Sequence, residues 1–154
     1  MTDISDHITH REATFSATAI RRKIDNTPND DQLENMRKLA VNVFEPLRAG
    51  LGDRVIMVSS FFRSETLNHL IGGSTTSQHC ANNGAAMDMD NDNYSSGPTN
   101  YDIFCYIRDN LEFDQLIWEY GNNESPAWVH VSFNEGHNRK QLLRCINGNY
   151  HKIY

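Results

Sequence analysis

Residues 77–88 read SQHCANNGAAMD, and residues 128–132 read WVHVS. The first stretch contains His79 and Asp88, the second contains His130, and both have the composition of a strand or a strand edge. A catalytic zinc ion takes three protein ligands and keeps its fourth position for water. Two imidazoles and one carboxylate supply such a set. The pattern therefore indicates a zinc hydrolase.

The segments around these two stretches predict helices alternating with short strands. Apolar residues at helical spacing indicate a long core helix over residues 31–47, which Asp31 and Glu34 would open as a capping box. The same spacing predicts a helix over residues 101–111, and a short helix is expected over residues 65–70. β-branched and alternating patterns predict the strands, which are expected at residues 54–60, 87–90, 115–120 and 128–133.

The last two of these strands are joined by turn-forming residues 121–126, which predicts a hairpin. In that hairpin, Glu119 and His130 can lie near each other across the ladder. Helices packed on a small, mostly antiparallel sheet make an α+β fold. Residues 1–28 are polar with few apolar anchors, so we expect an N-terminal arm with one short helical turn, packed on a single domain formed by residues 29–154.

Composition narrows the class of protein. The 154 residues are enough for one domain with its own core. The net charge of −6 disfavours nucleic-acid binding, which uses a basic surface. No apolar run is long enough for a membrane span, and the N-terminus lacks the pattern of a secretory signal. Three widely spaced cysteines favour a reducing compartment, and we expect synthesis in the cytoplasm. We separately favour a monomer.

Several short motifs follow one another along the chain in a characteristic order. They are Ser60-Phe61-Phe62-Arg63-Ser64 with Leu67 and Asn68, then Gly72-Gly73-Ser74, Ser77-Gln78-His79, Gly84-Ala85-Ala86-Met87-Asp88 and Trp128-Val129-His130-Val131-Ser132. In this order they resemble the zinc D-Ala-D-Ala carboxypeptidase and L-alanyl-D-glutamate endopeptidase family, peptidase M15, which shares its fold with the Hedgehog signalling domain. The resemblance covers about residues 10–133. It implies a Hedgehog/DD-peptidase-like fold.

The resemblance also implies one zinc ion per chain, bound by His79, Asp88 and His130. Such ligands leave the ion able to lower the pKa of a bound water to about 7. Glu119 would be the base that takes the proton, because related chains carry a glutamate beside the metal at this place. Glu124 in the hairpin loop is the alternative. We favour Glu119, because a strand fixes a side chain better than a loop does.

Four further residues would contact the substrate. The resemblance implies that Arg63 binds a substrate carboxylate or steadies the tetrahedral oxyanion, and a guanidinium suits both tasks. Ser77 and Gln78 would line the cleft and contact the peptide backbone. Trp128 would either form a wall that excludes water or belong to the core.

One departure from the family pattern bears on the carboxylate ligand. The family has two residues between the histidine and the glycine, whereas residues 80–83 place four between His79 and Gly84. A loop absorbs two extra residues at a small free-energy cost. Asp88 is then the expected ligand, with Asp90 on the same strand face as the alternative.

These features together imply a zinc metallopeptidase that hydrolyses a peptide bond in the stem peptides of bacterial peptidoglycan, of either the D-Ala-D-Ala carboxypeptidase or the L-Ala–D-Glu endopeptidase type. The absence of a signal peptide and of a separate wall-binding module fits a bacteriophage endolysin or virion enzyme, and a bacterial cell-wall hydrolase is an equal alternative. The rival hypothesis is a non-catalytic binding or structural module that keeps the fold, such as a phage virion component. The wide spacing from His79 to Asp88 favours the rival, and the presence of Arg63 and Glu119 argues against it.

Overall fold

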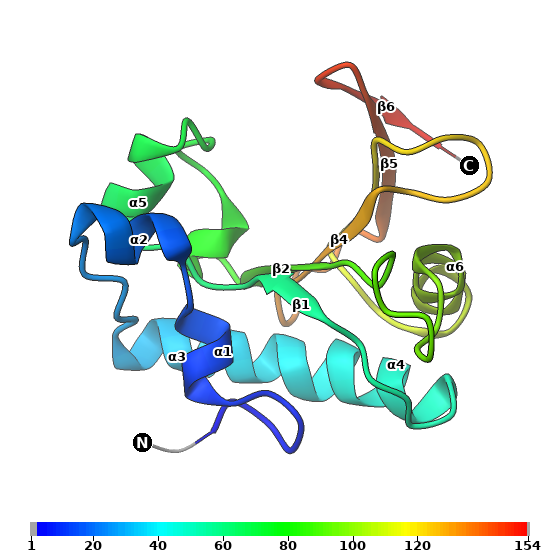
Figure 1. Cartoon of the computed structure of the whole chain (residues 1–154), viewed down its shortest axis with the longest axis horizontal. Coiled ribbons are helices and arrows are strands. Elements are labelled where there is room, and N and C mark those ends of the chain that lie inside the picture. Colours follow the sequence, from blue (N-terminus) through cyan, green and yellow to red (C-terminus); the bar gives the residue numbers. More distant parts are fainter. Residues whose placement is uncertain (1–2, 154) are drawn as a thin grey trace.

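The computed structural model describes residues 3–153 as helices packed on one sheet (Figure 1). Within these residues, six strands form the sheet in the order β1-β2-β4-β3-β5-β6. The strands are β1 (Val58–Ser60), β2 (Ala85–Met89), β3 (Gln115–Glu119), β4 (Trp128–Phe133), β5 (Gln141–Ile146) and β6 (Asn149–Lys152). The helices are α1 (His10–Thr14), α2 (Ala17–Arg22), α3 (Asp30–Leu39), η1 (Ala40–Phe44), α4 (Glu45–Gly50), α5 (Glu65–Leu70), η2 (Gln78–Cys80) and α6 (Asn100–Asn110).

The sheet is mostly antiparallel, as expected, and the fold is α+β. Among the described strands, β3 and β5 form the parallel pair, while every other neighbouring pair is antiparallel. In the central ladders, His130 of β4 lies opposite Asp88 of β2 on one side and opposite Ile117 of β3 on the other. These registers place one residue from each of three strands side by side.

The two faces of the sheet differ in what covers them. Side chains alternate along a strand, so Met87 and Met89 face one side while Asp88 faces the other. The apolar side is covered by α3, which packs against β2 and β4, and by α6, which packs against β3 and β4. Met87, Met89 and Val131 are fully buried in this core. The side chains of Asp88, His130 and Glu119 lie on the opposite face, which no α-helix within residues 3–153 covers.

One long helical segment forms the floor of the core, and it begins earlier than the sequence predicted. The N-cap is Asn29, whose side chain accepts from the Gln32 N–H while the Gln32 side chain accepts from the Asn29 N–H. The expected capping box of Asp31 and Glu34 is therefore wrong, because asparagine two residues upstream is an equally good cap. The helix widens to a π-turn at η1 just before Pro46, which has no N–H to donate to the helical ladder.

The N-terminal segment contains two short helices, α1 and α2, where one helical turn was expected. Thr9 caps α1 and Ser16 caps α2. The Asn26 amide donates to the Thr14 carbonyl and to the Phe62 carbonyl, so this segment is tied to the residues that precede α5.

Other expected elements differ at their ends. Helix α5 has the predicted bounds, and α6 begins one residue earlier than predicted, capped by Thr99. Strand β1 is confined to Val58–Ser60, because the Asn91 side chain accepts from the Met57 N–H in place of a neighbouring strand. Strand β2 ends at Met89, before Asp90.

The C-terminal hairpin of β5 and β6 was not expected from the sequence. It continues the sheet beyond β3 and projects at the upper right of Figure 1, at the end of the sheet away from β1 and β2. No helix within residues 3–153 is long and apolar enough to cross a membrane.

Candidate metal centre

The uncovered face of the sheet forms the floor of a cavity of about 850 Å³. Its floor carries side chains from β2, β3, β4, β5 and β6, and its walls come from residues 72–79 and from the loop that follows β4. All eight of the favoured site residues predicted from the sequence line it. They are Arg63, Ser77, Gln78, His79, Asp88, Glu119, Trp128 and His130.

His79, Asp88 and His130 meet at this cavity with their ligand atoms within 4.8 Å of one another. His79 Nε2 lies 3.4 Å from Asp88 Oδ1, and His130 Nδ1 lies 3.0 Å from the same oxygen. His79 comes from η2, Asp88 from β2 and His130 from β4. Three elements far apart in the sequence therefore aim one donor atom each at a common point.

The hydrogen bonding of His79 fits a metal ligand. Its Nδ1 lies 2.7 Å from the Phe61 carbonyl oxygen, which can only accept, so Nδ1 carries the proton. Nε2 is then an unprotonated nitrogen that points toward Asp88. A carbonyl that fixes the tautomer and the ring orientation is typical of histidine ligands in metal sites.

The charge states of the group also fit a divalent cation. Burial lowers the pKa of His79 and keeps the imidazole neutral, although Asp88 opposes this shift. Burial alone would raise the pKa of Asp88, but the two imidazoles outweigh burial and hold its pKa well below the usual range. A neutral imidazole nitrogen, as in His79, and an ionised carboxylate oxygen are donors that zinc accepts.

The two extra residues before Gly84 do not displace the carboxylate. They lie in a loop after η2, where Ala81 has φ +57° and Gly84 has φ +72°. Strand β2 begins directly after Gly84, so Asp88 is opposite His130. Asp90 is turned elsewhere, because its Oδ1 accepts from the Asn100 amide and from the Asp92 N–H.

Glu119, at the end of β3, lies on the same face as His130 and lines the cavity. Only 6% of its surface is exposed. Burial raises its pKa, and the nearby His130 imidazole opposes that shift. Glu124, the alternative, is exposed in the hairpin loop and is outside the cavity lining. The structure thus brings Glu119 to the site and leaves Glu124 away from it.

Arg63 lies at the cavity with part of its guanidinium unpaired. Its Nη2 lies 3.4 Å from the Ser77 hydroxyl, and within the described residues its buried Nε has no hydrogen-bond partner. Burial lowers the pKa of Arg63, and the Asp88 carboxylate opposes the shift. A buried guanidinium with a free N–H is suited to an anionic ligand.

Ser77 and Trp128 have additional roles in the local structure. The Ser77 hydroxyl caps η2 by accepting from the His79 N–H. The Trp128 ring packs against Tyr120, with their centroids 5.3 Å apart, and both rings lie at the cavity. Trp128 is therefore part of the cavity wall.

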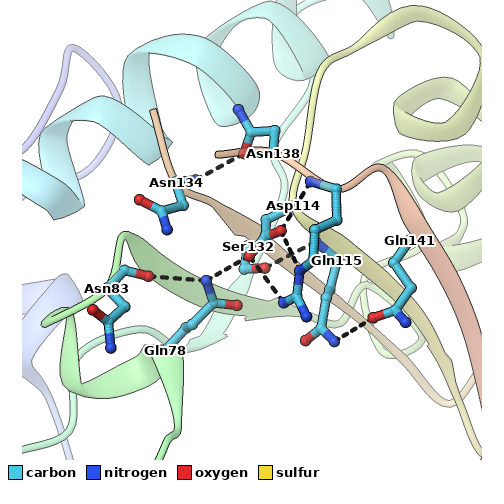
Figure 2. A network of polar contacts seen from close by, with 9 residues as sticks. Gln78, Asn83, Asp114, Gln115, Ser132, Asn134, Asn138 and Gln141 are labelled. Carbon is cyan, nitrogen blue, oxygen red and sulfur yellow. Dashed lines mark hydrogen bonds and ion pairs between the residues drawn. The ribbon is translucent and has the colours of Figure 1, made fainter. Parts of the chain in front are cut away.

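Sequence reasoning missed one polar wall of the cavity. Asp114, just before β3, binds the Arg139 side chain and the Gln78 side chain. Figure 2 shows the contact between Asp114 and Gln78, with Asn83 and Asn134 nearby. Tyr150 of β6 also lines the cavity, and burial raises its pKa to about 12. The Asn147-Gly148 turn between β5 and β6 was the one sequence signal for this hairpin.

A family model described as Peptidase M15 matches residues 6–132, which include His79, Asp88, Glu119 and His130. No curated protein matches the chain. The match ends within β4, so β5, β6 and the loop that precedes them lie outside it.

Proposed function

Since the chain belongs to the peptidase M15 family, we propose that it is a zinc-dependent metallopeptidase that hydrolyses a peptide bond in the stem peptides of bacterial peptidoglycan. The observation that carries this proposal is the meeting of His79, Asp88 and His130 at one cavity. The cavity is large enough for several residues of an extended peptide, and both polar and apolar side chains line it.

In this proposal, His79, Asp88 and His130 hold the zinc ion. Zinc in such a site acts as a Lewis acid toward water and toward the scissile carbonyl. The Glu119 carboxylate takes a proton from the attacking water and returns it to the nitrogen of the leaving amine. Its raised pKa suits the first step, because a carboxyl group with a higher pKa accepts a proton more readily.

Arg63 is the proposed anion-binding residue. Its side chain lines the cavity beside Ser77, and its charged guanidinium allows it to hold a substrate carboxylate or the developing oxyanion. Gln78 and Trp128 complete the substrate-binding wall. A monomer and an origin in a phage remain predictions from the sequence.

The first test is metal content together with peptidase activity. Elemental mass spectrometry should find about one zinc per chain in the wild type and little in the His79→Ala variant. Digestion of purified muropeptides, followed by mass spectrometry, should release either D-Ala or a stem peptide cut after L-Ala. The product identifies which bond is cleaved.

The Glu119→Gln variant tests the base. We expect zinc content to be unchanged and the cleavage rate to fall about 100-fold or more, because glutamine cannot take the proton. The matched variant Glu124→Gln, in the exposed loop, should retain the wild-type rate. A wild type that binds zinc but cleaves no peptide would support the non-catalytic module. Full activity in Glu119→Gln would contradict the assignment of the base.

A further inference from the structure

The carboxamide of Gln78 has both of its N–H groups occupied. Its Nε2 donates to the Asn83 carbonyl oxygen at 2.9 Å and to Asp114 Oδ2 at 2.8 Å (Figure 2). An amide nitrogen carries two protons, so these two bonds use all of its donors. Both partners can only accept when Asp114 is ionised.

These partners fix which way the carboxamide faces. A rotation by 180° would place Oε1 against a carbonyl oxygen and a carboxylate oxygen, which repel it and would lose two hydrogen bonds. The geometry therefore leaves one orientation of Gln78, with the nitrogen toward Asn83 and Asp114.

Asp114 is itself held in place. Its side chain is buried, with 3% exposed, and its Oδ1 accepts from both the Arg139 backbone N–H at 3.0 Å and the Arg139 Nε at 2.7 Å. The Arg139 Nη2 donates to Oδ2 at 3.1 Å. This two-pronged ion pair keeps the carboxylate in the plane where it meets Gln78.

The remaining polar atom of Gln78 is its oxygen. Oε1 accepts no hydrogen bond from any residue in the range 3–153. It is not buried, so it is accessible to solvent. Gln78 lines the cavity next to His79 in the chain. The wall beside the metal centre thus presents a fixed, accessible acceptor.

We infer that Gln78 is a specificity-determining residue that accepts one backbone N–H of the bound peptide, and that Asp114 and Arg139 are positioning residues that keep its oxygen toward the cavity. This inference rests on the proposed peptidase function. It gives the cavity two unlike polar contacts: Arg63 offers donors to an anionic group, and Gln78 offers an acceptor to a donor group. A carboxylate is disfavoured next to the Gln78 oxygen, since the oxygen would repel it.

Two residues of this arrangement lie outside the motifs by which the family was identified. Asn83 belongs to the loop lengthened by two residues, and the Gln78 side chain spans that loop to reach its carbonyl. Arg139 lies beyond residue 132, where the family match ends.

The test compares the wild type and a Gln78 variant on a series of N-methylated peptides. The probes are a synthetic stem pentapeptide and its analogues, each with one backbone N–H replaced by N–CH₃. We expect Gln78→Met to raise KM for the unmodified peptide about tenfold with little change in kcat, which is the size of one lost hydrogen bond. One analogue should lose about tenfold in the wild type and almost nothing further in Gln78→Met.

Asp114→Asn tests the positioning role. The asparagine amide can turn either face toward Gln78, so the carboxamide is free to flip. In Asp114→Asn, we therefore compare KM for the analogue that loses tenfold in the wild type with KM for the unmodified peptide. The ratio of these two KM values should fall toward one. This ratio does not depend on the fraction of folded protein, so a merely structural effect of the substitution leaves it unchanged. Gln141→Met, outside the cavity lining, is the control and should keep the wild-type ratio.

If each N-methylation raises KM by the same factor in the wild type and in Gln78→Met, the inference is wrong. Calorimetric titration of the metal-free protein with the same peptides gives a second measure, independent of turnover. If the wild type ignores stem peptides but cleaves a member of a mixed L-peptide library, the proposed substrate is wrong, and the same series built on that library peptide decides the role of Gln78. A wild type that neither binds nor cleaves either set would contradict both proposals.

Discussion

Asp114 shows how one buried charge organises a wall of the cavity. Its carboxylate has four hydrogen-bond donors, three from Arg139 and one from Gln78. Burial alone would raise its pKa, but these donors outweigh burial and hold the pKa below its ordinary value of 3.8. The folded protein therefore binds this proton less readily than the unfolded chain does.

This difference in pKa predicts an acid-dependent loss of stability. A carboxyl group whose pKa is depressed by folding contributes stability above its unfolded pKa, and that contribution is lost as the pH falls through the unfolded value toward the folded one. We expect Asp114→Asn to lower the free energy of unfolding by about 2 kcal/mol at pH 7. The gap between wild type and variant should shrink as the pH falls below about 4. Urea unfolding at pH 7, 5 and 3.5 measures it.

Asp109→Asn is the matched control. Asp109 is also paired with an arginine, its neighbour Arg108, and the pairing lowers its pKa, but the pair is exposed. An exposed pair contributes little to stability, so this variant should unfold at the same urea concentration as the wild type at every pH. A gap for Asp114→Asn that is constant with pH would contradict the role assigned to its charge.

Single residues with a motif around them could be predicted from the sequence, and residues without one could not. Asp88, His130 and Glu119 lie on strands with a clear pattern, whereas His79, expected on a strand or strand edge, lies in η2, and the structure brings all four to one cavity. Asp114 and Arg139 meet across 25 residues of chain, between a strand end and an irregular loop. Local periodicity carries no information about such a contact.

At the scale of elements, the junction between η2 and β2 decides where the carboxylate lies. Gly84 has φ +72°, and a Cβ there would clash with the Phe133 carbonyl of the neighbouring strand. The close approach is what starts the pairing of β2 with β4, in which Ala85 lies opposite Phe133. Glycine is the residue that satisfies both demands.

The Gly84→Ala substitution should therefore cost more than the backbone conformation alone. A left-handed conformation costs a non-glycine residue about 1 kcal/mol, and the clash adds to this by forcing β2 away from β4. We expect a loss of about 2–4 kcal/mol in the free energy of unfolding, and weaker zinc binding because Asp88 moves with the strand. Denaturant unfolding and a competitive zinc titration measure the two effects.

Gly136→Ala separates the clash from the conformation. Gly136 has φ +78°, but a Cβ there would meet nothing within 4 Å. It should lose about 1 kcal/mol with unchanged zinc affinity. If both variants lose the same free energy of unfolding, the close approach of Gly84 to Phe133 does not contribute to stability.

The elements that the sequence predicted are those with long or strict patterns. The core helix, α5, α6 and the strands β3 and β4 have apolar residues at regular spacing and recognisable ends. The hairpin of β5 and β6 lacks this regularity, because its second strand has no buried residue and its first is buried only at Leu143 and Cys145. Its place beside β3 follows from long-range pairing with Ile117 and Glu119, which local patterns do not report.

At the scale of the whole molecule, the candidate metal centre joins elements that are separate in the sequence. His79 follows α5, Asp88 lies in β2, and His130 lies in β4, which also pairs with the strand that carries Glu119. The unfolded chain does not hold these three side chains together. A metal ion that binds them therefore binds the folded state far more tightly than the unfolded state, and its binding free energy adds to stability.

This linkage predicts that zinc raises the melting temperature. A ligand present at 100 times its Kd adds about 2.7 kcal/mol, which for a domain of this size corresponds to a shift of roughly 5–10 °C. Thermal unfolding followed by circular dichroism, after treatment with EDTA and after zinc is restored, measures the shift. His79→Ala should lose most of it, while His69→Ala, an exposed histidine on α5, should keep it. A shift that survives in His79→Ala would place the bound zinc at another site, because the group at the cavity would then retain only two of its three ligands.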